Sequence, residues 1–266
     1  MSRPRSAPLL LSLLLLAGCV DPEDRATTAR VAGSAADVEV YGNLYEVVHE
    51  GDLHHKVALD RWKGVRDLYA VGALDELRGE VTVVGGVPVV SYPDDGGVRT
   101  VYGVEASDER ACLLVAARVP AWRRDVVDRP IGSLDDLTAL LAERAKKDGL
   151  GADEAFPFLL VGPVERLELH VIDGSRLPEE PPAPATAHEV HLAASIRRTI
   201  DSGEATLVGF YSTKHERVFT HVGERLHLHA VVPADLKPTI TGHVDGLKLA
   251  KGAFLSLPLR PTGERD

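Results

Sequence analysis

The stretch Arg225-Leu226-His227-Leu228-His229-Ala230-Val231-Val232 determines both the fold and the site that this sequence predicts. Polar and apolar residues alternate along it, which is typical of a strand whose two faces differ and which puts His227 and His229 on the same face. A third histidine, His243, follows in Thr241-Gly242-His243-Val244. Three histidines that leave one coordination position open are typical of catalytic zinc, so the pattern predicts a Zn²⁺ site. The alternative is two exposed strand histidines and an unrelated third.

The remaining histidines form weaker candidates among the 11 in the chain. His188 and His191 are spaced to share one helix face, but they follow a proline-rich run and fit a solvated helix start. The loop before the His-x-His strand contains two more histidines, which could hydrogen-bond to a metal-binding side chain. These are His215 and His221, whereas His49, His54 and His55 flank a turn and fit surface positions.

The N-terminus predicts export and lipidation. Arg3 and Arg5 precede an apolar run from Leu9 to Leu16 that is too short to span a bilayer as a helix. The run ends in Leu16-Ala17-Gly18-Cys19, which resembles a bacterial lipobox. We therefore expect residues 1–18 to be a lipoprotein signal peptide and Cys19 to carry the lipid; an ordinary cleaved signal is the alternative. We therefore expect the protein in the bacterial cell envelope, anchored by lipid, with the outer membrane favoured and the chain facing the periplasm or the exterior.

Composition limits the partners and the covalent stabilisation. The formal net charge of −10 disfavours binding to phosphate backbones, so we expect no nucleic-acid partner. With Cys19 lipidated, Cys112 has no internal partner for a disulfide and, within an apolar run, fits a buried thiol. The polar, alanine-rich residues 19–37 predict a flexible tether.

The rest of the chain, residues 38–266, predicts one domain with an N-lobe of about 38–176 and a C-lobe of about 177–266. Gly85-Gly86 separates two alternating runs and predicts a hairpin. Ser133 precedes Asp135 and Asp136 and predicts a helix that runs to about Lys147. Two more helices are expected at 53–68 and 191–200, and strands at 38–48, 80–84, 87–92, 100–104, 111–119, 156–160, 164–172, 206–211, 225–232 and 243–249.

Three C-terminal segments resemble the signature of the α-acetolactate decarboxylase family. They are Gly203-Glu204-Ala205-Thr206-Leu207-Val208-Gly209-Phe210-Tyr211-Ser212, the Gly223-to-His229 segment, and Gly242-His243-Val244. In the N-terminal half, the segments 43–52 and 70–81 are similar to the opening strand of that family and to its Gly-Thr-Phe-x-x-Leu-Asp-Gly-Glu motif. The resemblance covers roughly Val38 to Pro258, and the His-x-His block is its most specific part.

The resemblance implies a fold, a cofactor and an activity. The expected fold is α/β of the α+β type, with two mixed β-sheet lobes and few helices. Members of the family bind one zinc through three histidines, which match His227, His229 and His243, and convert the small molecule 2-acetolactate to acetoin and carbon dioxide. Glu80, after Gly79, matches the functional glutamate of the family; a solvated charge after a turn is the alternative.

The chain departs from the family at the arginine that holds the substrate carboxylate. Alignment from Gly162 places His170 at that position, and alignment back from Leu177-Pro178 places Ser175 there, beside Arg176. We expect Arg176 to make the contact, since a guanidinium binds carboxylates better than an imidazole does. Glu264 is the only match for a late acidic residue. A different β-keto or α-hydroxy acid as substrate, and a non-catalytic envelope binding protein, are the alternatives; a homodimer is one option for the assembly.

Overall fold

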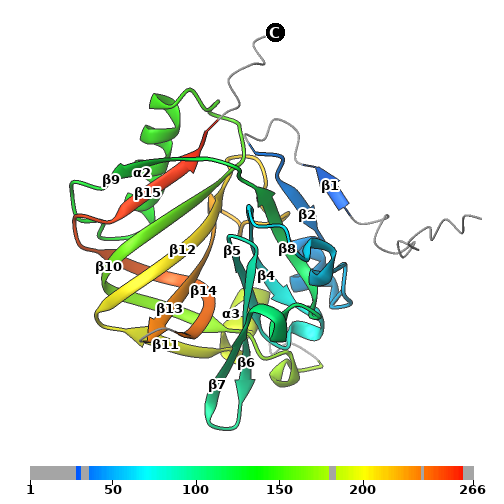
Figure 1. The fold of residues 1–266 in the computed structure, drawn as a ribbon. Coiled ribbons are helices and arrows are strands. Elements are labelled where there is room, and N and C mark those ends of the chain that lie inside the picture. Colours follow the sequence, from blue (N-terminus) through cyan, green and yellow to red (C-terminus); the bar gives the residue numbers. More distant parts are fainter. Residues whose placement is uncertain (1–27, 31–35, 180–183, 235–236, 260–266) are drawn as a thin grey trace, which may run out of the picture.

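The computed structural model describes residues 28–30, 36–179, 184–234 and 237–259 (Figure 1). The strands form two sheets. The first has the order β1-β2-β8-β4-β5-β6-β7, with β3 paired to β8. Its strands are β1 (Thr28–Arg30), β2 (Glu39–Tyr41), β3 (Val57–Ala58), β4 (Leu68–Leu74), β5 (Glu80–Val84), β6 (Val87–Asp94), β7 (Gly97–Tyr102) and β8 (Arg110–Arg118).

The hairpin between β5 and β6 fixes the register in the middle of the first sheet. Gly85 and Gly86 both have positive φ angles, 57° and 80°, as a tight turn between two strands requires. A β-carbon on Gly86 would lie 1.9 Å from the backbone oxygen of Val65, so only glycine fits there. This turn sets Glu80 opposite Ser91 and brings both into the interior.

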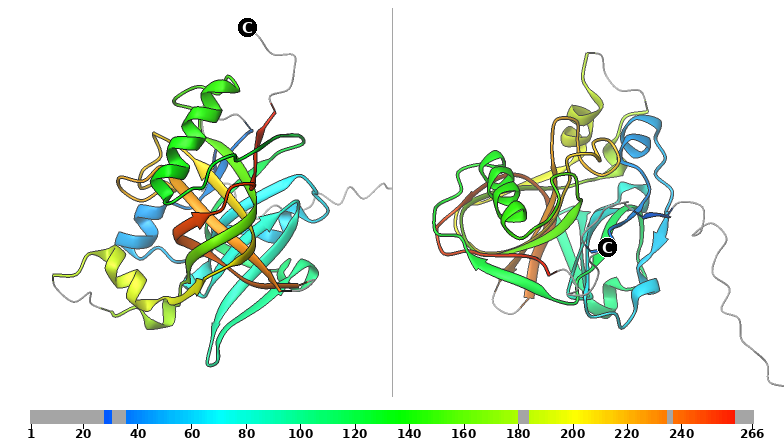
Figure 2. Two further views of the ribbon diagram at one scale, coloured as in Figure 1. Left: turned by 90° about the vertical axis from the view of Figure 1, so that its left-hand side faces the viewer. Right: turned by 90° about the horizontal axis from the view of Figure 1, so that it is seen from above.

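The second sheet is organised around one long strand, β10 (Phe156–Val171). The strands β11 (Ile196–Ile200) and β12 (Gly203–Tyr211) pair with it, and so do β14 (Lys237–Leu249) and β15 (Phe254–Pro258). Because β13 (Leu226–Ala234) joins β12 to β14, the sheet closes on itself, as the right-hand view of Figure 2 shows. The remaining strand, β9 (Trp122–Val126), pairs with β15 at the edge.

The predicted helix at Ser133 is confirmed as α2 (Leu134–Lys147), whose Ser133 cap accepts a hydrogen bond from the Asp136 amide. Its apolar side packs into the core of the closed sheet. The second helix, α3 (Ala187–Ala194), begins at a capping box made by Thr186 and Glu189. Shorter helical turns lie at Glu46–Glu50, Leu59–Trp62, Asp75–Leu77, Gly103–Ala106 and Gly174–Arg176.

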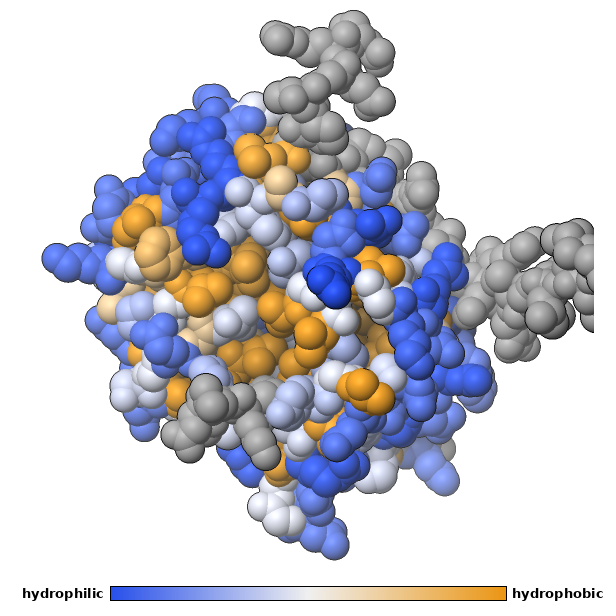
Figure 3. Space-filling model, viewed as in Figure 1, coloured by the Kyte–Doolittle hydropathy of each residue, from blue (hydrophilic) through white to orange (hydrophobic). Residues whose placement is uncertain are grey.

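The two sheets pack against each other through apolar side chains. Val71 and Val115 of the first sheet share a buried cluster with Leu159, Val208 and Phe210 of the second. On the face shown in Figure 3, hydrophobic residues gather toward the middle and hydrophilic residues surround them. The edge of this interface is where the strands that carry the three histidines face β4 and β5.

Two sheets and few helices are confirmed, but the expected mixed sheets are wrong. Every strand pair within the sheets of the described chain is antiparallel, both between consecutive strands such as β5 and β6 and between distant ones such as β4 and β8. The sheets also divide the chain between Arg118 and Trp122, whereas the predicted lobes divided it near residue 176. The reason is β10, which was predicted as two strands in the N-lobe and is one strand in the second sheet.

Two predicted helices are wrong in whole or in part. No α-helix forms at 53–68; Val57 instead pairs with Ala111 of β8, and Gly64 adopts a φ of 84° that no helix accepts. At 191–200 the helix α3 ends by Ala194, and the following residues pair with β10 as β11. Pairing with a free strand edge outweighed helical periodicity in both segments.

Some predictions concern residues outside the described part of the chain. The signal peptide, Cys19 and Glu264 lie there, as does most of the predicted tether. Within that tether, Thr28–Arg30 pair with β2, which extends the edge of the first sheet. Among the described residues, no helix is long and apolar enough to cross a membrane.

Candidate metal centre

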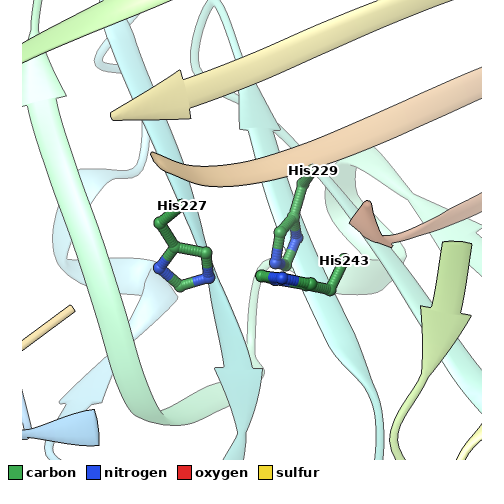
Figure 4. Close-up of side chains that lie close together, drawn as sticks. All are labelled: His227, His229 and His243. Carbon is green, nitrogen blue, oxygen red and sulfur yellow. The ribbon is translucent and has the colours of Figure 1, made fainter. Parts of the chain in front are cut away.

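His227, His229 and His243 converge at one point, with their rings turned toward one another (Figure 4). One ring nitrogen from each lies within 4.8 Å of those of the other two. His227 and His229 are buried, and His243 is partly buried. The predicted cluster is therefore present in the structure, and its dimensions suit one metal ion held by three imidazoles.

Strand pairing explains why these three side chains meet. His229 on β13 lies directly opposite His243 on β14, and directly paired residues of antiparallel strands project to the same face. His227 is two residues from His229 and shares that face, whereas Leu226, Leu228 and Ala230 project into the core of the closed sheet. The alternation in the sequence thus separates the metal-binding face from the core.

A chain of hydroxyl groups fixes the protonation of His229. Thr241 Oγ1 donates to the backbone oxygen of Ala230 at 2.9 Å, so the 2.6 Å contact between the two threonine hydroxyls has Thr82 as its donor. Thr82 Oγ1 is then free to accept, and its 3.1 Å contact with His229 Nδ1 is an N–H···O bond. The proton therefore lies on Nδ1, and Nε2 presents a lone pair.

Two buried nitrogen atoms in the cluster have no hydrogen-bond partner among the described residues. They are His229 Nε2 and His227 Nδ1. An unsatisfied buried polar atom costs about 1–3 kcal/mol, and a metal ion would satisfy both. The residues present therefore fit a bound metal, with the second nitrogen of His229 held by Thr82 as metal-binding histidines commonly require.

Burial keeps the three imidazoles uncharged. It lowers the pKa of His227 to about 3, and it lowers the pKa of His229 and of His243 well below the ordinary value. Neighbouring histidines add to this effect, since each would repel a second positive charge. Neutral imidazole is the form that binds a metal, so the cluster needs no deprotonation at neutral pH.

Glu80 lies against the cluster, with Oε2 3.6 Å from His229 Nε2. The carboxyl group is buried on β5, and its Oε1 accepts a hydrogen bond of 3.4 Å from the Ile172 amide. Burial raises the pKa of Glu80 to about 8, although a positive charge on His170 would lower it. At neutral pH this group holds a proton in the metal-free chain, beside the point where the imidazoles meet.

His170 occupies the other side of His243. The two are directly paired across β10 and β14, and their ring centroids are 5.1 Å apart. Asp245, the extra residue of a β-bulge in β14, turns back to accept a 2.8 Å hydrogen bond from His170 Nδ1. Burial lowers the pKa of His170, but the bond and charge of Asp245 outweigh it and the net pKa is raised.

A cavity of about 70 Å³ lies in front of the cluster and is lined by Glu80, His170, His227 and His243. A wider cavity of about 420 Å³ shares His243 with it. Three histidines that were only weak candidates in the sequence line these spaces. His188 and His221 line both cavities, and His191 lines the smaller one. The i, i+3 spacing of His188 and His191 on α3 could be read from the sequence, but the part of the molecule that α3 faces could not.

Arg176 is not brought to this site. It ends a short helical turn, its side chain is half exposed, and its Nε pairs with Asp173 at 2.9 Å. It lines neither of the two cavities. Of the two residues expected at the arginine position, only His170 lies beside the cluster.

The fold and site thus define a β-protein of two antiparallel sheets with a three-histidine candidate metal centre at their junction. A scan against models of protein families and a search of curated proteins found no match. Solved structures do match. α-Acetolactate decarboxylase from Bacillus subtilis strain 168 has a TM-score of 0.61 at 14% identity, over 82% of this chain and 84% of that one.

Two further structures agree. Acetolactate decarboxylase from Bacillus subtilis subspecies spizizenii has a TM-score of 0.62 at 12% identity, over 84% of this chain and 85% of that one. A Staphylococcus aureus protein similar to α-acetolactate decarboxylase has a TM-score of 0.59 at 14% identity, over 82% and 83%. At such identities the likeness establishes the fold, which is that of the acetolactate decarboxylases.

Proposed function

We propose that this protein is a zinc-dependent decarboxylase of 2-acetolactate or a closely similar α-hydroxy-β-keto acid. The observation that carries the proposal is the convergence of the His227, His229 and His243 rings, with Glu80 beside them. Support comes from the fold shared with acetolactate decarboxylases and from the resemblance of the histidine segments to the signature of that family.

The three imidazoles would hold the ion through one nitrogen each. When bound, zinc supplies a Lewis acid that polarises the keto and hydroxyl oxygens of the substrate and stabilises the negative charge that remains after carbon dioxide leaves. The donor set suits zinc, since three imidazole nitrogens are a ligand set of catalytic zinc sites. Thr82 keeps His229 in the tautomer that can bind.

Glu80 would return the proton. Loss of carbon dioxide leaves an electron pair on the substrate carbon, and acetoin forms when that carbon receives a proton. The Glu80 carboxyl group lies 3.6 Å from the His229 nitrogen that faces the cluster, so it is placed to deliver that proton. The apolar walls made by Leu113, Ile172 and Phe219 keep bulk water from competing for the carbanion.

The test uses the full chain, first treated with a chelator and then loaded with one equivalent of zinc. We expect acetoin from racemic 2-acetolactate, and loss of this activity in His227→Ala. The variant Glu80→Gln should retain bound zinc and lose at least about a hundredfold in kcat, as removal of a general acid does. Zinc binding without acetoin from 2-acetolactate would refute this substrate, and a panel of related keto acids would then test the substrate class.

The cellular location is a separate part of the proposal. We propose that Cys19 is lipidated and anchors the protein in the bacterial envelope, because residues 16–19 resemble a lipobox. Labelling with a fatty-acid analogue should mark the wild-type protein and not Cys19→Ala. Equal labelling of the two proteins, or recovery of the wild type without lipid, would refute the anchor.

A further inference from the structure

Arg197 stands at the end of a row of side chains that begins in the histidine cluster. On β11 it lies directly opposite His170 of β10, which lies opposite His243 of β14, which lies opposite His229 of β13. Directly paired residues of antiparallel strands project to one face, so the arginine shares the face of the three histidines. Four consecutive strands thus carry one arginine and three imidazoles in line.

The distance along this row suits a small molecule. Neighbouring strands lie about 4.8 Å apart, so the backbone of Arg197 is roughly 10 Å from that of His243. The arginine side chain is long enough to cover much of this span. With His188, His221 and His243, Arg197 lines the cavity of about 420 Å³ beside the cluster. A ligand between His243 and the guanidinium would occupy that space.

Arg197 also differs from Arg166 and Arg176 in its ion pairing. No carboxylate of the described residues forms an ion pair with Arg197. Other arginines do have such partners: Arg166 pairs with Glu168, and Arg176 pairs with Asp173. A guanidinium without a carboxylate partner at the wall of a cavity is suited to a bidentate anion.

We propose that Arg197 binds the carboxylate of the substrate and so determines its class: a monocarboxylate whose hydroxyl or keto oxygen faces the histidine cluster. The inference rests on the proposed function for the position of the substrate on the metal. It assigns the anion contact to β11, on the far side of His170 from the cluster, rather than to the strand or turn where the sequence placed it. Arg197 acts as a specificity-determining residue, and Glu80 keeps its role.

The test is calorimetric titration of the zinc-loaded full chain with a compound that cannot react. 2-Hydroxy-2-methylbutanoate carries the hydroxyl and the carboxylate but has no keto group, and its amide is the neutral counterpart. We expect Arg197→Ala to weaken binding of the acid at least tenfold and to change binding of the amide less than twofold. Arg197→Lys should fall between, since lysine keeps the charge and loses the fork.

Arg176→Ala is the matched control and should bind the acid as the wild type does, because Arg176 pairs with Asp173 and lines neither cavity. Zinc content measured for each protein shows that the variants are folded and loaded. Equal binding of the acid by wild type and Arg197→Ala, equal losses for acid and amide, or a wild type that does not prefer the acid would each overturn the inference.

The acetoin assay separates this inference from the proposed function. If the wild type makes no acetoin while Arg197→Ala selectively loses the acid, the activity is refuted and the anion site stands. If the wild type makes acetoin and Arg197→Ala has unchanged KM and kcat, the activity stands and the anion site is refuted. Both ideas together require acetoin from the wild type and a KM raised at least tenfold in Arg197→Ala.

Discussion

Replacing His227 with leucine should change the stability of the metal-free protein only slightly and should abolish its stabilisation by zinc. The reason is the buried Nδ1 atom of His227, which has no partner among the described residues. In the absence of the ion, a metal-binding histidine lowers the stability of the folded protein through its unsatisfied nitrogen, whereas a histidine that serves only packing does not. The prediction therefore distinguishes a metal ligand from a structural core histidine.

The magnitude follows from three contributions. Removing the unsatisfied nitrogen should return about 1–3 kcal/mol. Losing the backbone hydrogen bond with Phe219, which raises the pKa of His227, should cost about 0.5–1.5 kcal/mol. The exchange of similarly sized side chains should cost less than about 1.5 kcal/mol. The net change is thus about −2 to +2.5 kcal/mol, or roughly −8 to +10 °C in Tm for a domain of this size.

Zinc should then separate the two proteins. A ligand at 100 times its Kd stabilises the folded state by about 2.7 kcal/mol, which is about 5–11 °C here. Thermal unfolding followed by circular dichroism, with a chelator and then with zinc, measures both effects. His215→Leu is the control: His215 bonds to Ser212 Oγ at 2.6 Å outside the cluster, so its loss should destabilise equally in both conditions. A His227→Leu protein that loses more than about 3 kcal/mol in chelator, or a wild type that zinc does not stabilise, would refute the reasoning.

Three further predictions concern the surroundings of the cluster. Burial raises the pKa of Glu80 from 4.5 to about 8, so the stability that the protonated carboxyl group gives to the folded protein is complete below pH 4.5 and is lost as the pH rises toward 8. In chelator, the stability of Glu80→Gln relative to the wild type should therefore increase by up to about 4 kcal/mol between pH 5 and 8. A difference in urea titrations that does not change with pH would contradict this. Thr82→Val removes the acceptor of the His229 N–H and should weaken zinc binding about 10- to 100-fold in competition with a chelating dye, and unchanged affinity would count against the tautomer argument. Gly242→Ala would place a β-carbon 2.3 Å from a backbone oxygen of β10 and should lower the free energy of unfolding by about 1–3 kcal/mol. The control Gly96→Ala meets nothing within 4 Å and should change that free energy little. Equal effects of the two substitutions in chemical unfolding would show that the close approach is unimportant.

The metal cluster could be predicted because it depends on local features. Two histidines at i and i+2 share a face of any strand, whatever the strand packs against. The third lies on the next strand of a hairpin-like pair, and its position relative to His229 is set within one short stretch of chain. The hairpin at Gly85-Gly86 and the helix at Ser133 were predictable for the same reason, since turn and cap preferences act over a few residues.

The remainder of the site depends on registers between distant strands, and periodicity does not encode those. His170 and Arg197 meet because β11 pairs with the far end of β10, and the sequence predicted a helix across β11. Asp245 contacts His170 because a β-bulge shifts the register of β14, and no local sequence motif predicts that bulge. The expected role of Arg176 came from alignment along one strand, which could not show that the turn after β10 points its side chain toward Asp173.

The charges around the cavity bear on the order of binding. Burial holds the three imidazoles of the cluster uncharged and keeps Glu80 protonated, so in the metal-free protein these groups offer no positive charge to an anion. A substrate carboxylate that leaves water must be compensated, or it will not enter. On the proposed function, the metal supplies that charge at one end of the substrate and Arg197 at the other. Neither should suffice alone, and for this reason we expect substrate binding to follow metal binding.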